Sequence, residues 1–186
     1  MSIWTVFSGF FTRAGKKMCP DCRDYIEKNC RILDLGCGSG LIGKAFADFF
    51  DAKLDGVDVK DYRACDISFK LFDGENIPYP DKSFDATLIN YVLHHSLNPV
   101  KLLEEAGRVT RDIVVVYEDL PEGFWSKLSS KIHSGLTLLL HGGANIPEFK
   151  TEKEWKKLFK ELGFKLVFEK RVSNFPLKRH LFILRV

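Results

Sequence analysis

A glycine-rich turn directly after a short apolar run constrains this chain more than any other feature. Residues 32–43 read ILDLGCGSGLIG, which predicts a buried strand, a tight turn and the first turn of a helix. Because glycine permits positive φ and carries no side chain, backbone N–H groups in such a turn can close on a ligand. The positive end of the helix dipole points at the same place. The turn therefore predicts a site for the carboxylate or phosphate of a nucleotide-like ligand.

The glycines and their neighbours fit two ligand classes. Gly38-Ser-Gly-Leu-Ile-Gly43 has the G-x-G-x-x-G pattern, and Asp58 follows Gly38 by 20 residues, as in proteins that bind NAD(P). Asp34, however, places a carboxylate two residues before Gly36, where it repels a diphosphate and attracts an ammonium or sulfonium group. S-adenosylmethionine (SAM) carries both of these cations. The order Asp-Leu-Gly-Cys-Gly-Ser-Gly resembles motif I of the class I SAM-dependent methyltransferases, and an NAD(P)-dependent oxidoreductase is the alternative.

A second segment carries an independent resemblance. Residues 73–85 read DGENIPYPDKSFD and follow a short strand predicted at 69–72. They resemble the D-x-x-x-L-P-F-P-D-x-S-F-D segment of the type 11 methyltransferases of small molecules, with Ile77 in place of Leu and Tyr79 in place of Phe. Together the two segments imply a methyltransferase that uses SAM as the cofactor and releases S-adenosylhomocysteine.

The resemblance implies which residues bind this cofactor, all of them near the carboxyl ends of predicted strands. The methionine end faces one aspartate and the glycine turn, the ribose faces a second aspartate, and adenine faces a third. A backbone carbonyl lies near the ammonium or the sulfonium. The implied residues are Asp34, Gly36, Cys37 and Gly38 at the methionine end, Asp58 and Val59 at the ribose, Asp73 and Gly74 at the adenine, and Asn90 for the backbone carbonyl.

Two histidines follow the strand predicted at 84–90, near the reacting end of the cofactor. His94 and His95 titrate in the right range to accept a proton from an oxygen or carbon acceptor, so both are candidate catalytic residues. Similar proteins carry an L-H-H or L-E-H sequence here. By that resemblance His95 orders the loop, while His94 stands at the more variable position. The alternative bases are Tyr91, Glu118 and His141.

Alternating strand and helix patterns predict an α/β fold. The resemblance implies a Rossmann-like seven-stranded sheet, mostly parallel with an antiparallel strand near the carboxyl terminus, and helices on both faces. A dinucleotide dehydrogenase would instead carry a sixth parallel strand and a separate substrate domain. The strands are predicted at 32–35, 53–59, 69–72, 84–90, 112–117, 164–172 and 180–186, and the main helices at 41–50, 99–109 and after the capping box Thr151–Glu154.

The predicted domain division has an N-terminal helical cap at 1–30 and a SAM-dependent methyltransferase domain at 31–186. Within that domain, residues 118–150 form a cover on the substrate side. Apolar residues recur at helical spacing through 124–140, which favours an acceptor with an apolar portion. The alternative for this stretch is an ordinary structural helix.

The first 18 residues predict a helix, because apolar residues stand at positions 3, 7, 10 and 11. We expect it to cap the core or the ligand mouth. The alternative is a helix that lies on an anionic membrane surface and holds it through Arg13, Lys16 and Lys17. Cys19-Pro-Asp-Cys22 follows as a lone C-x-x-C at an expected helix start, and no second ligand pair is near enough to predict a metal site.

Net charge and cysteine spacing bear on the class of the methyl acceptor and on the cellular compartment. A net charge of +3 is too small for the basic face that nucleic acids require. No apolar run reaches the roughly 20 residues of a membrane span, and the first residues lack the pattern of a signal peptide. Five cysteines at irregular spacing favour reduced thiols in the cytoplasm. We therefore expect a small-molecule acceptor, with a non-catalytic SAM-binding subunit as a third alternative.

Overall fold

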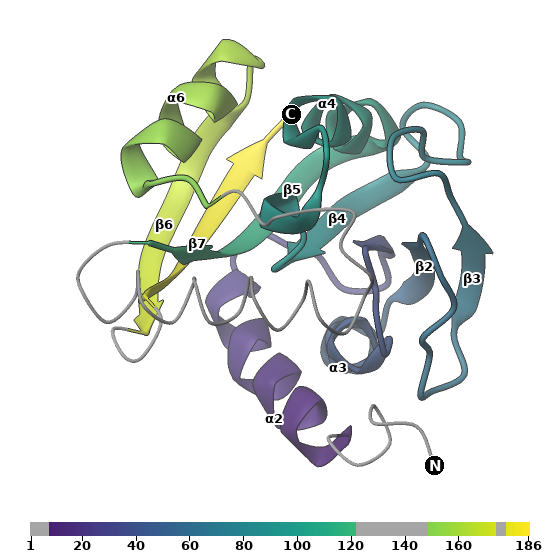
Figure 1. Cartoon of the computed structure of the whole chain (residues 1–186). Coiled ribbons are helices and arrows are strands. Elements are labelled where there is room, and N and C mark those ends of the chain that lie inside the picture. The colour runs from purple at the N-terminus through teal and green to yellow at the C-terminus, as the bar shows by residue number, and fades with distance from the viewer. Residues whose placement is uncertain (1–7, 122–148, 174–177) are drawn as a thin grey trace, which may run out of the picture.

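The computed structural model describes residues 8–121, 149–173 and 178–186. Its strands are β1 (Arg31–Leu35), β2 (Lys53–Asp58), β3 (Ser68–Leu71), β4 (Phe84–Asn90), β5 (Thr110–Leu120), β6 (Lys165–Ser173) and β7 (Lys178–Arg185). They form one seven-stranded sheet in the order β3-β2-β1-β4-β5-β7-β6 (Figure 1). Strand β7 runs antiparallel to β5 and β6, and β1 to β5 pair in parallel. The predicted fold class is therefore confirmed.

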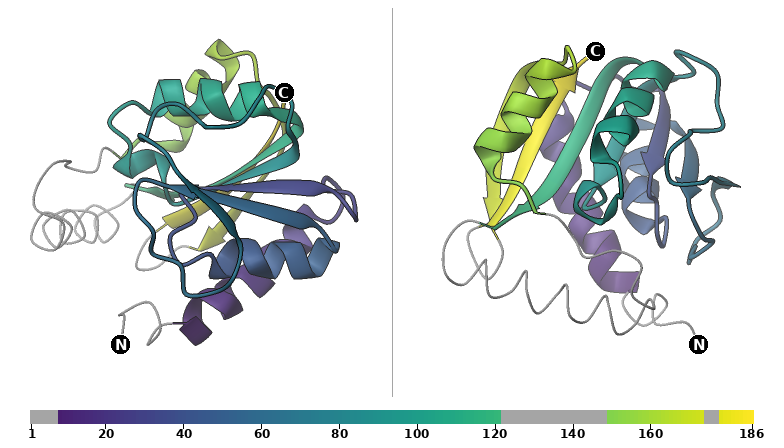
Figure 2. Two further views of the ribbon diagram at one scale, coloured as in Figure 1. Left: turned by 90° about the vertical axis from the view of Figure 1, so that its right-hand side faces the viewer. Right: turned by 45° about the horizontal axis from the view of Figure 1, so that its top comes forward.

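Helices cover both faces of this sheet (Figure 2). Helices α2 (Ser8–Met18) and α3 (Leu41–Phe50) lie on one face, and α4 (Pro99–Val109) and α6 (Glu152–Glu161) lie on the other. Successive residues of a strand point to opposite faces, so each strand contributes to two separate cores. Since both faces are buried, the central strands are almost continuously apolar.

The two cores are built from alternate residues of the same strands. The core under α4 and α6 takes Leu33, Leu35, Val114, Val116, Phe182 and Leu184 from the sheet and Leu103, Trp155 and Phe159 from the helices. The core under α2 and α3 takes Ile32, Leu88, Ile113, Val115, Leu181 and Ile183 from the sheet and Met18, Phe46 and Phe50 from the helices. A shift of one residue in any strand would exchange these two sets, so packing fixes the register.

The predicted end of the fifth strand at residue 117 is wrong. Strand β5 extends to Leu120, because β7 pairs with it along its whole carboxyl half, so residues 118–120 belong to the sheet and not to a cover. The rest of the expected cover, including the amphipathic stretch at 124–140, falls in 122–148, outside the described residues.

The C-x-x-C pair closes a helix and does not begin one. Cys19 and Cys22 bound the 3₁₀ turn η1 (Cys19–Cys22), which continues directly from α2, and both are fully buried in the second core. Burial raises the pKa of each thiol to about 12, so neither forms a thiolate at neutral pH. All five cysteines are free thiols.

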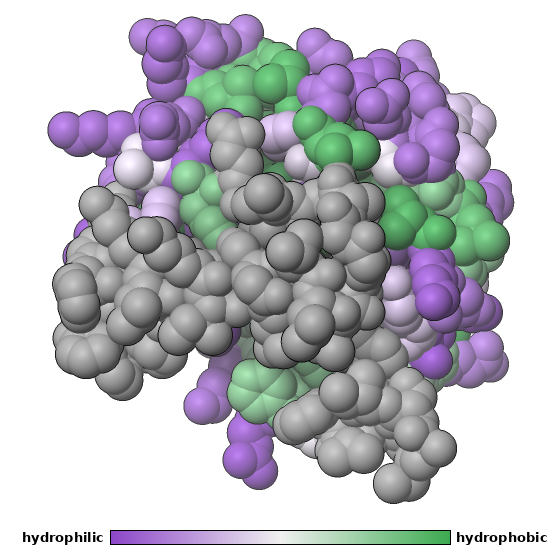
Figure 3. All heavy atoms as spheres, in the orientation of Figure 1, coloured by the Kyte–Doolittle hydropathy of each residue, from purple (hydrophilic) through white to green (hydrophobic). Residues whose placement is uncertain are grey.

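Helix α2 matches the described part of the predicted N-terminal helix. It packs so closely on α3 that a Cβ at Gly15 would lie 2.7 Å from Cβ of Ala45. Its outer face exposes Phe10, Arg13, Lys16 and Lys17, and Figure 3 shows apolar side chains at the surface over α2 and near β3. Among the residues that the structure describes, no helix has both the length and the apolar character to cross a bilayer.

The capping box at the start of α6 yields a first prediction. The Thr151 hydroxyl accepts the Glu154 N–H, and the Glu154 carboxylate accepts the Thr151 N–H at 2.7 Å. Thr151→Ala is expected to lower the free energy of unfolding by about 1 kcal/mol, because the Glu154 N–H in the first turn of α6 then loses its side-chain acceptor. Urea unfolding followed by circular dichroism measures this loss. Thr151→Ser keeps the hydroxyl, and an equal loss in that variant would contradict the capping argument.

Candidate functional site

The candidate site lies where the chain reverses its direction of travel across the sheet. Strand β1 pairs with β2 on one side and with β4 on the other, and both pairs are parallel. The connections leaving the carboxyl ends of β1 and β4 therefore diverge, and in open sheets of this kind the ligand crevice lies between such connections. Open α/β sheets bind their ligands at such a switch point.

The glycine turn between β1 and α3 has the conformation that its sequence predicts. Gly36, Gly38 and Gly40 have φ of 70°, 51° and 74°, a region that other residues rarely occupy. A Cβ at Gly36 would lie 2.6 Å from Cγ2 of Val92, so this position must be glycine for the turn to pack. A Cβ at Gly38 would meet nothing within 4 Å. Gly38 therefore faces the open side of the turn.

The N–H groups of this turn are used inside the fold, in contrast to the expectation that they close on the ligand. Those of Gly36 and Cys37 donate to the Val57 carbonyl at 2.8 and 3.0 Å. That of Gly38 donates to Oδ2 of Asp58 at 2.8 Å. These bonds connect the turn to β2. The three N–H groups are therefore already used, and a ligand would contact the surface of the turn without bonding to them.

Asp34 is the buried charge of the site. Its side chain is 1% exposed, and its Oδ1 lies 3.5 Å from Nδ2 of Asn90. Within the described residues, Oδ2 of Asp34 and Oδ1 of Asn90 have no hydrogen-bond partner. The Gly43 N–H lies near the carboxylate and lowers its pKa without closing a hydrogen bond of normal geometry. These two buried oxygens are hydrogen-bond acceptors without a donor. A primary ammonium group has three N–H donors and could bond to both.

The third glycine of the motif leaves room for this carboxylate. A Cβ built on Gly43 would collide with Oδ2 of Asp34, so the first turn of α3 holds the carboxylate only because residue 43 is glycine. Helix α3 has no side-chain cap at Gly40. Its positive end therefore acts on the chain's own anion. This arrangement explains the G-x-G-x-x-G spacing without a dinucleotide.

Burial raises the pKa of Asp34 to about 7, and the negative charge of Asp58 adds to this effect. An unfolded chain ionises this carboxyl near pH 4, whereas the folded protein keeps it protonated up to about pH 7. Asp34 therefore lowers the stability of the ligand-free protein as pH rises from 4 to 7. A bound cation would reverse the shift, since an ion pair favours the carboxylate.

Asp58 supports the turn from the end of β2. Its Oδ2 accepts the Gly38 N–H, and its Oδ1 accepts the Val59 N–H at 2.7 Å. Burial raises its pKa. Asp58 is half-buried and lies directly beside the glycine turn. Val59, in contrast, exposes 58% of its surface next to the crevice.

Asp73 caps its own loop beyond β3. Its Oδ1 accepts the N–H groups of Glu75 and Asn76 at 2.8 and 2.6 Å, and these bonds together with the Asn76 side chain lower its pKa to about 2. Gly74, at φ 91°, lies against Val59, since a Cβ there would be 3.4 Å from its Cγ1. The structure therefore brings the two implied adenine residues beside those implied for the ribose.

The two histidines lie in different surroundings in the turn η2 (Leu93–His95). His94 is 2% exposed, and its Nδ1 lies 2.6 Å from Oε2 of Glu118. Burial of the ring lowers the pKa of His94, but the Glu118 carboxylate outweighs it and the net shift is upward. His95 is half-buried. His94 therefore makes a contact that orders this loop, a role that the resemblance assigned to His95.

Glu118 is the residue whose importance sequence reasoning underestimated. It was expected only as an alternative base, yet it is fully buried and holds the backbone after β4 as well as His94. The available signal was an acidic residue that ends a run of apolar strand residues. Burial raises the pKa of Tyr91 to about 12, which makes it a poor base. His141 lies outside the described residues.

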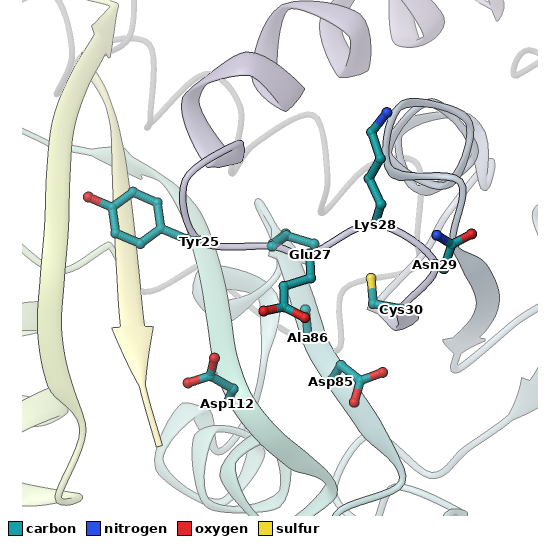
Figure 4. A pocket seen from close by; sticks show the side chains of 9 residues that line it. Tyr25, Glu27, Lys28, Asn29, Cys30, Asp85, Ala86 and Asp112 are labelled. Carbon is teal, nitrogen blue, oxygen red and sulfur yellow. The ribbon is translucent and has the colours of Figure 1, made fainter.

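A separate pocket of about 340 Å³ lies at the opposite edge of the sheet (Figure 4). Glu27, Asp85 and Asp112 line it, at the amino ends of β4 and β5. Asp85 accepts the Arg31 N–H and pairs with Arg111, and Asp112 pairs with Arg185. The lining contains none of the residues implied for the cofactor.

The buried carboxyl group gives a second prediction. Asp34→Asn is expected to stabilise the ligand-free protein at pH 8 by on the order of 3 kcal/mol and to change little at pH 4, because the amide never ionises. Unfolding in urea at both pH values measures the difference. Asp85→Asn is the control of opposite sign, since Arg31 and Arg111 lower the pKa of Asp85. Equal stability of Asp34→Asn and wild type at pH 8 would refute the burial argument.

Known proteins share this arrangement. Residues 33–116 match the family model described as a methyltransferase domain. The demethylmenaquinone methyltransferase of Paenarthrobacter aurescens is 34% identical over 106 residues, which make up 54% of this chain and 42% of that protein. An uncharacterized protein of Methanocaldococcus jannaschii is 34% identical over 143 residues, 73% of this chain and 64% of that protein. This chain thus spans less than two thirds of either relative.

The fold extends the similarity to the rest of the chain. A solved SAM-dependent methyltransferase from Archaeoglobus fulgidus aligns over the full length of both chains with a TM-score of 0.76, at 16% sequence identity. S-adenosylmethionine is the cofactor that the matched domain implies, and the donor-poor pair Asp34 and Asn90 fits its ammonium group. The matched domain makes residues 33–116 similar to the methyltransferase domain, and the sheet topology is the one found in solved SAM-dependent methyltransferases.

Proposed function

We propose that this protein transfers a methyl group from SAM to a small-molecule acceptor that has an apolar portion. The observation that carries the proposal is the pair of buried acceptors, Asp34 and Asn90, that lack donors at the switch point of the sheet. A cation completes this pair, whereas the diphosphate of NAD(P) would bring negative charge to a buried carboxylate.

The cofactor residues follow from the geometry of the strand ends. Asp34 and Asn90 hold the ammonium group, and Gly36, Cys37 and Gly38 form the surface on which the methionine part lies. Asp58, with Val59 beside it, faces the ribose, and Asp73 and Gly74 line the adenine end. What supports this assignment is the contact of Gly74 with Val59 and the bond from Gly38 to Asp58, which place these residues along one edge.

SAM supplies a methyl group that a positive sulfur already activates, so the protein mainly provides alignment and excludes water. Asp34 fixes one end of the cofactor through a charged hydrogen bond in an apolar sheet, where such bonds are strong. An oxygen or carbon acceptor also loses a proton. Of the two candidate histidines, His95 is the more accessible and would accept it, since Nδ1 of His94 is held by Glu118.

Two observations support a small apolar acceptor. The net charge of +3 is smaller than is typical of proteins that bind RNA or DNA. The relative from Paenarthrobacter aurescens is named as a demethylmenaquinone methyltransferase. Its region of similarity covers the cofactor half of this chain, so the acceptor is inferred and rests on the experiment below.

The test is incubation of the purified protein with SAM that carries a deuterated methyl group and with fractions of a cell extract. We expect the labelled product in the fraction soluble in organic solvent, where mass spectrometry detects it. Label in RNA or in protein would refute the small-molecule acceptor. SAM binding by calorimetry without product in any fraction would indicate a non-catalytic subunit, and NADH binding without SAM binding would refute the whole assignment.

The open side of the glycine turn generates a further prediction. Gly38→Ala is expected to weaken SAM binding more than tenfold, because the added methyl enters the space facing the crevice. Gly163→Ala is a matched control, since Gly163 also has positive φ, 84°, and also has nothing within 4 Å of a built Cβ, but ends α6. Both variants should lose about 1 kcal/mol of stability from backbone strain. Calorimetric titration that shows the same SAM affinity in both would contradict the prediction.

A further inference from the structure

The segment between β4 and η2 has an unusual backbone. Tyr91 has φ 61°, a conformation that is rare for a bulky aromatic residue and that is energetically unfavourable. Such a conformation persists only where neighbouring structure imposes it. Here the residue directly before it is Asn90, which reaches Asp34, and the residue directly after it is Val92, which packs on Gly36.

Strand β5 imposes this conformation through three contacts. The Tyr91 N–H donates to the Tyr117 carbonyl at 2.8 Å. The Leu93 N–H donates to Oε1 of Glu118, also at 2.8 Å, and Oε2 of Glu118 pairs with Nδ1 of His94 at 2.6 Å. One buried carboxylate therefore holds both the backbone and a side chain of the turn that follows Asn90.

The His94 ring is itself held on both sides. It stacks on Phe149 with ring centroids 4.8 Å apart and an interplanar angle of 17°, and it lies 4.1 Å from the ring of His95. A proton acceptor must reach its substrate, whereas Glu118 is 0% exposed and His94 2%. The geometry of the pair is suited to fixing a loop.

We propose that Glu118 is a positioning residue for the cofactor: by holding Leu93 and His94 it sets Asn90 and Val92 against Asp34 and the glycine turn. The proposal rests on SAM binding at that site. Glu118 acts through the turn and does not touch the cofactor. Its removal should therefore act on SAM affinity through Asn90, and not only on stability.

The test compares SAM dissociation constants measured by calorimetry. Glu118→Ala should weaken SAM binding more than tenfold. Glu118→Gln should be intermediate, because the amide oxygen still accepts the Leu93 N–H while the charge opposite His94 is lost. Thermal unfolding and circular dichroism confirm that each variant is folded, and the Gln variant keeps the volume of the side chain if the Ala variant does not fold.

Asp85→Asn is the matched control, because Asp85 also accepts one backbone N–H and pairs with one cationic side chain, but at the amino end of β4. It should change SAM affinity less than twofold. A double-mutant cycle with Asn90→Ala measures the coupling between the two residues in SAM binding, which a general loss of stability would not produce. We expect Glu118→Gln to cause little further loss in the Asn90→Ala background, since its effect passes through Asn90.

The outcomes separate the two proposals. If the wild type does not bind SAM, the proposed function fails. If the wild type binds SAM and the folded Glu118 variants bind within twofold of it, the positioning role is refuted. Additive losses in the double-mutant cycle, or an equal loss in Asp85→Asn, would also refute it, because either result would indicate a general effect of destabilisation.

Discussion

The site depends on one buried carboxylate, that of Asp34, which has fewer hydrogen-bond donors around it than it can accept. Asp34 lies in a strand whose neighbours are Leu33 and Leu35, both fully buried, so its charge has no access to water. The surrounding structure accommodates this in three ways. Gly43 leaves out a side chain, the start of α3 provides a positive pole, and Asn90 approaches from the adjacent strand. None of these supplies a counter-ion, and that shortage selects a cationic ligand.

The sheet makes this arrangement by its topology. Parallel pairing puts the carboxyl ends of β1, β2 and β4 at one edge, so Asp34, Asp58 and Asn90 meet although they are up to 56 residues apart in sequence. Covering helices on both faces keep the strands dry, which strengthens every electrostatic interaction at the edge. In the acidic pocket at the other edge, Asp85 and Asp112 are already paired with arginines, so neither of these carboxylates lacks a counter-ion.

Local patterns were sufficient to predict elements whose structure is set locally. The bounds of β4 and of α4, and the capping box of α6, agree with the structure because alternation, a proline at the first helical position and a Thr-x-x-Glu sequence are complete within a few residues. The glycine turn was also predicted, since glycine is the residue that most readily adopts the positive φ that this turn requires.

Features that depend on pairing between distant segments were not predicted. The Leu93 N–H and Glu118 are 25 residues apart, and nothing in either segment alone shows that they meet. The extra length of β5 comes from β7, which lies more than 50 residues further along the chain. The donors of the glycine turn were expected to face a ligand, but the Val57 carbonyl and Asp58 use them. The roles of the site residues stay predictions until a bound cofactor is observed.

The insertion of β7 between β5 and β6 has a consequence for biosynthesis. Residues 178–185 supply the hydrogen bonds for one whole edge of β5, the strand that carries Tyr117 and Glu118. A nascent chain on the ribosome therefore exposes an unsatisfied apolar edge until these residues have left the exit tunnel. Until β7 pairs with β5, the strand that holds the turn after β4 through Tyr117 and Glu118 is itself paired on one side only.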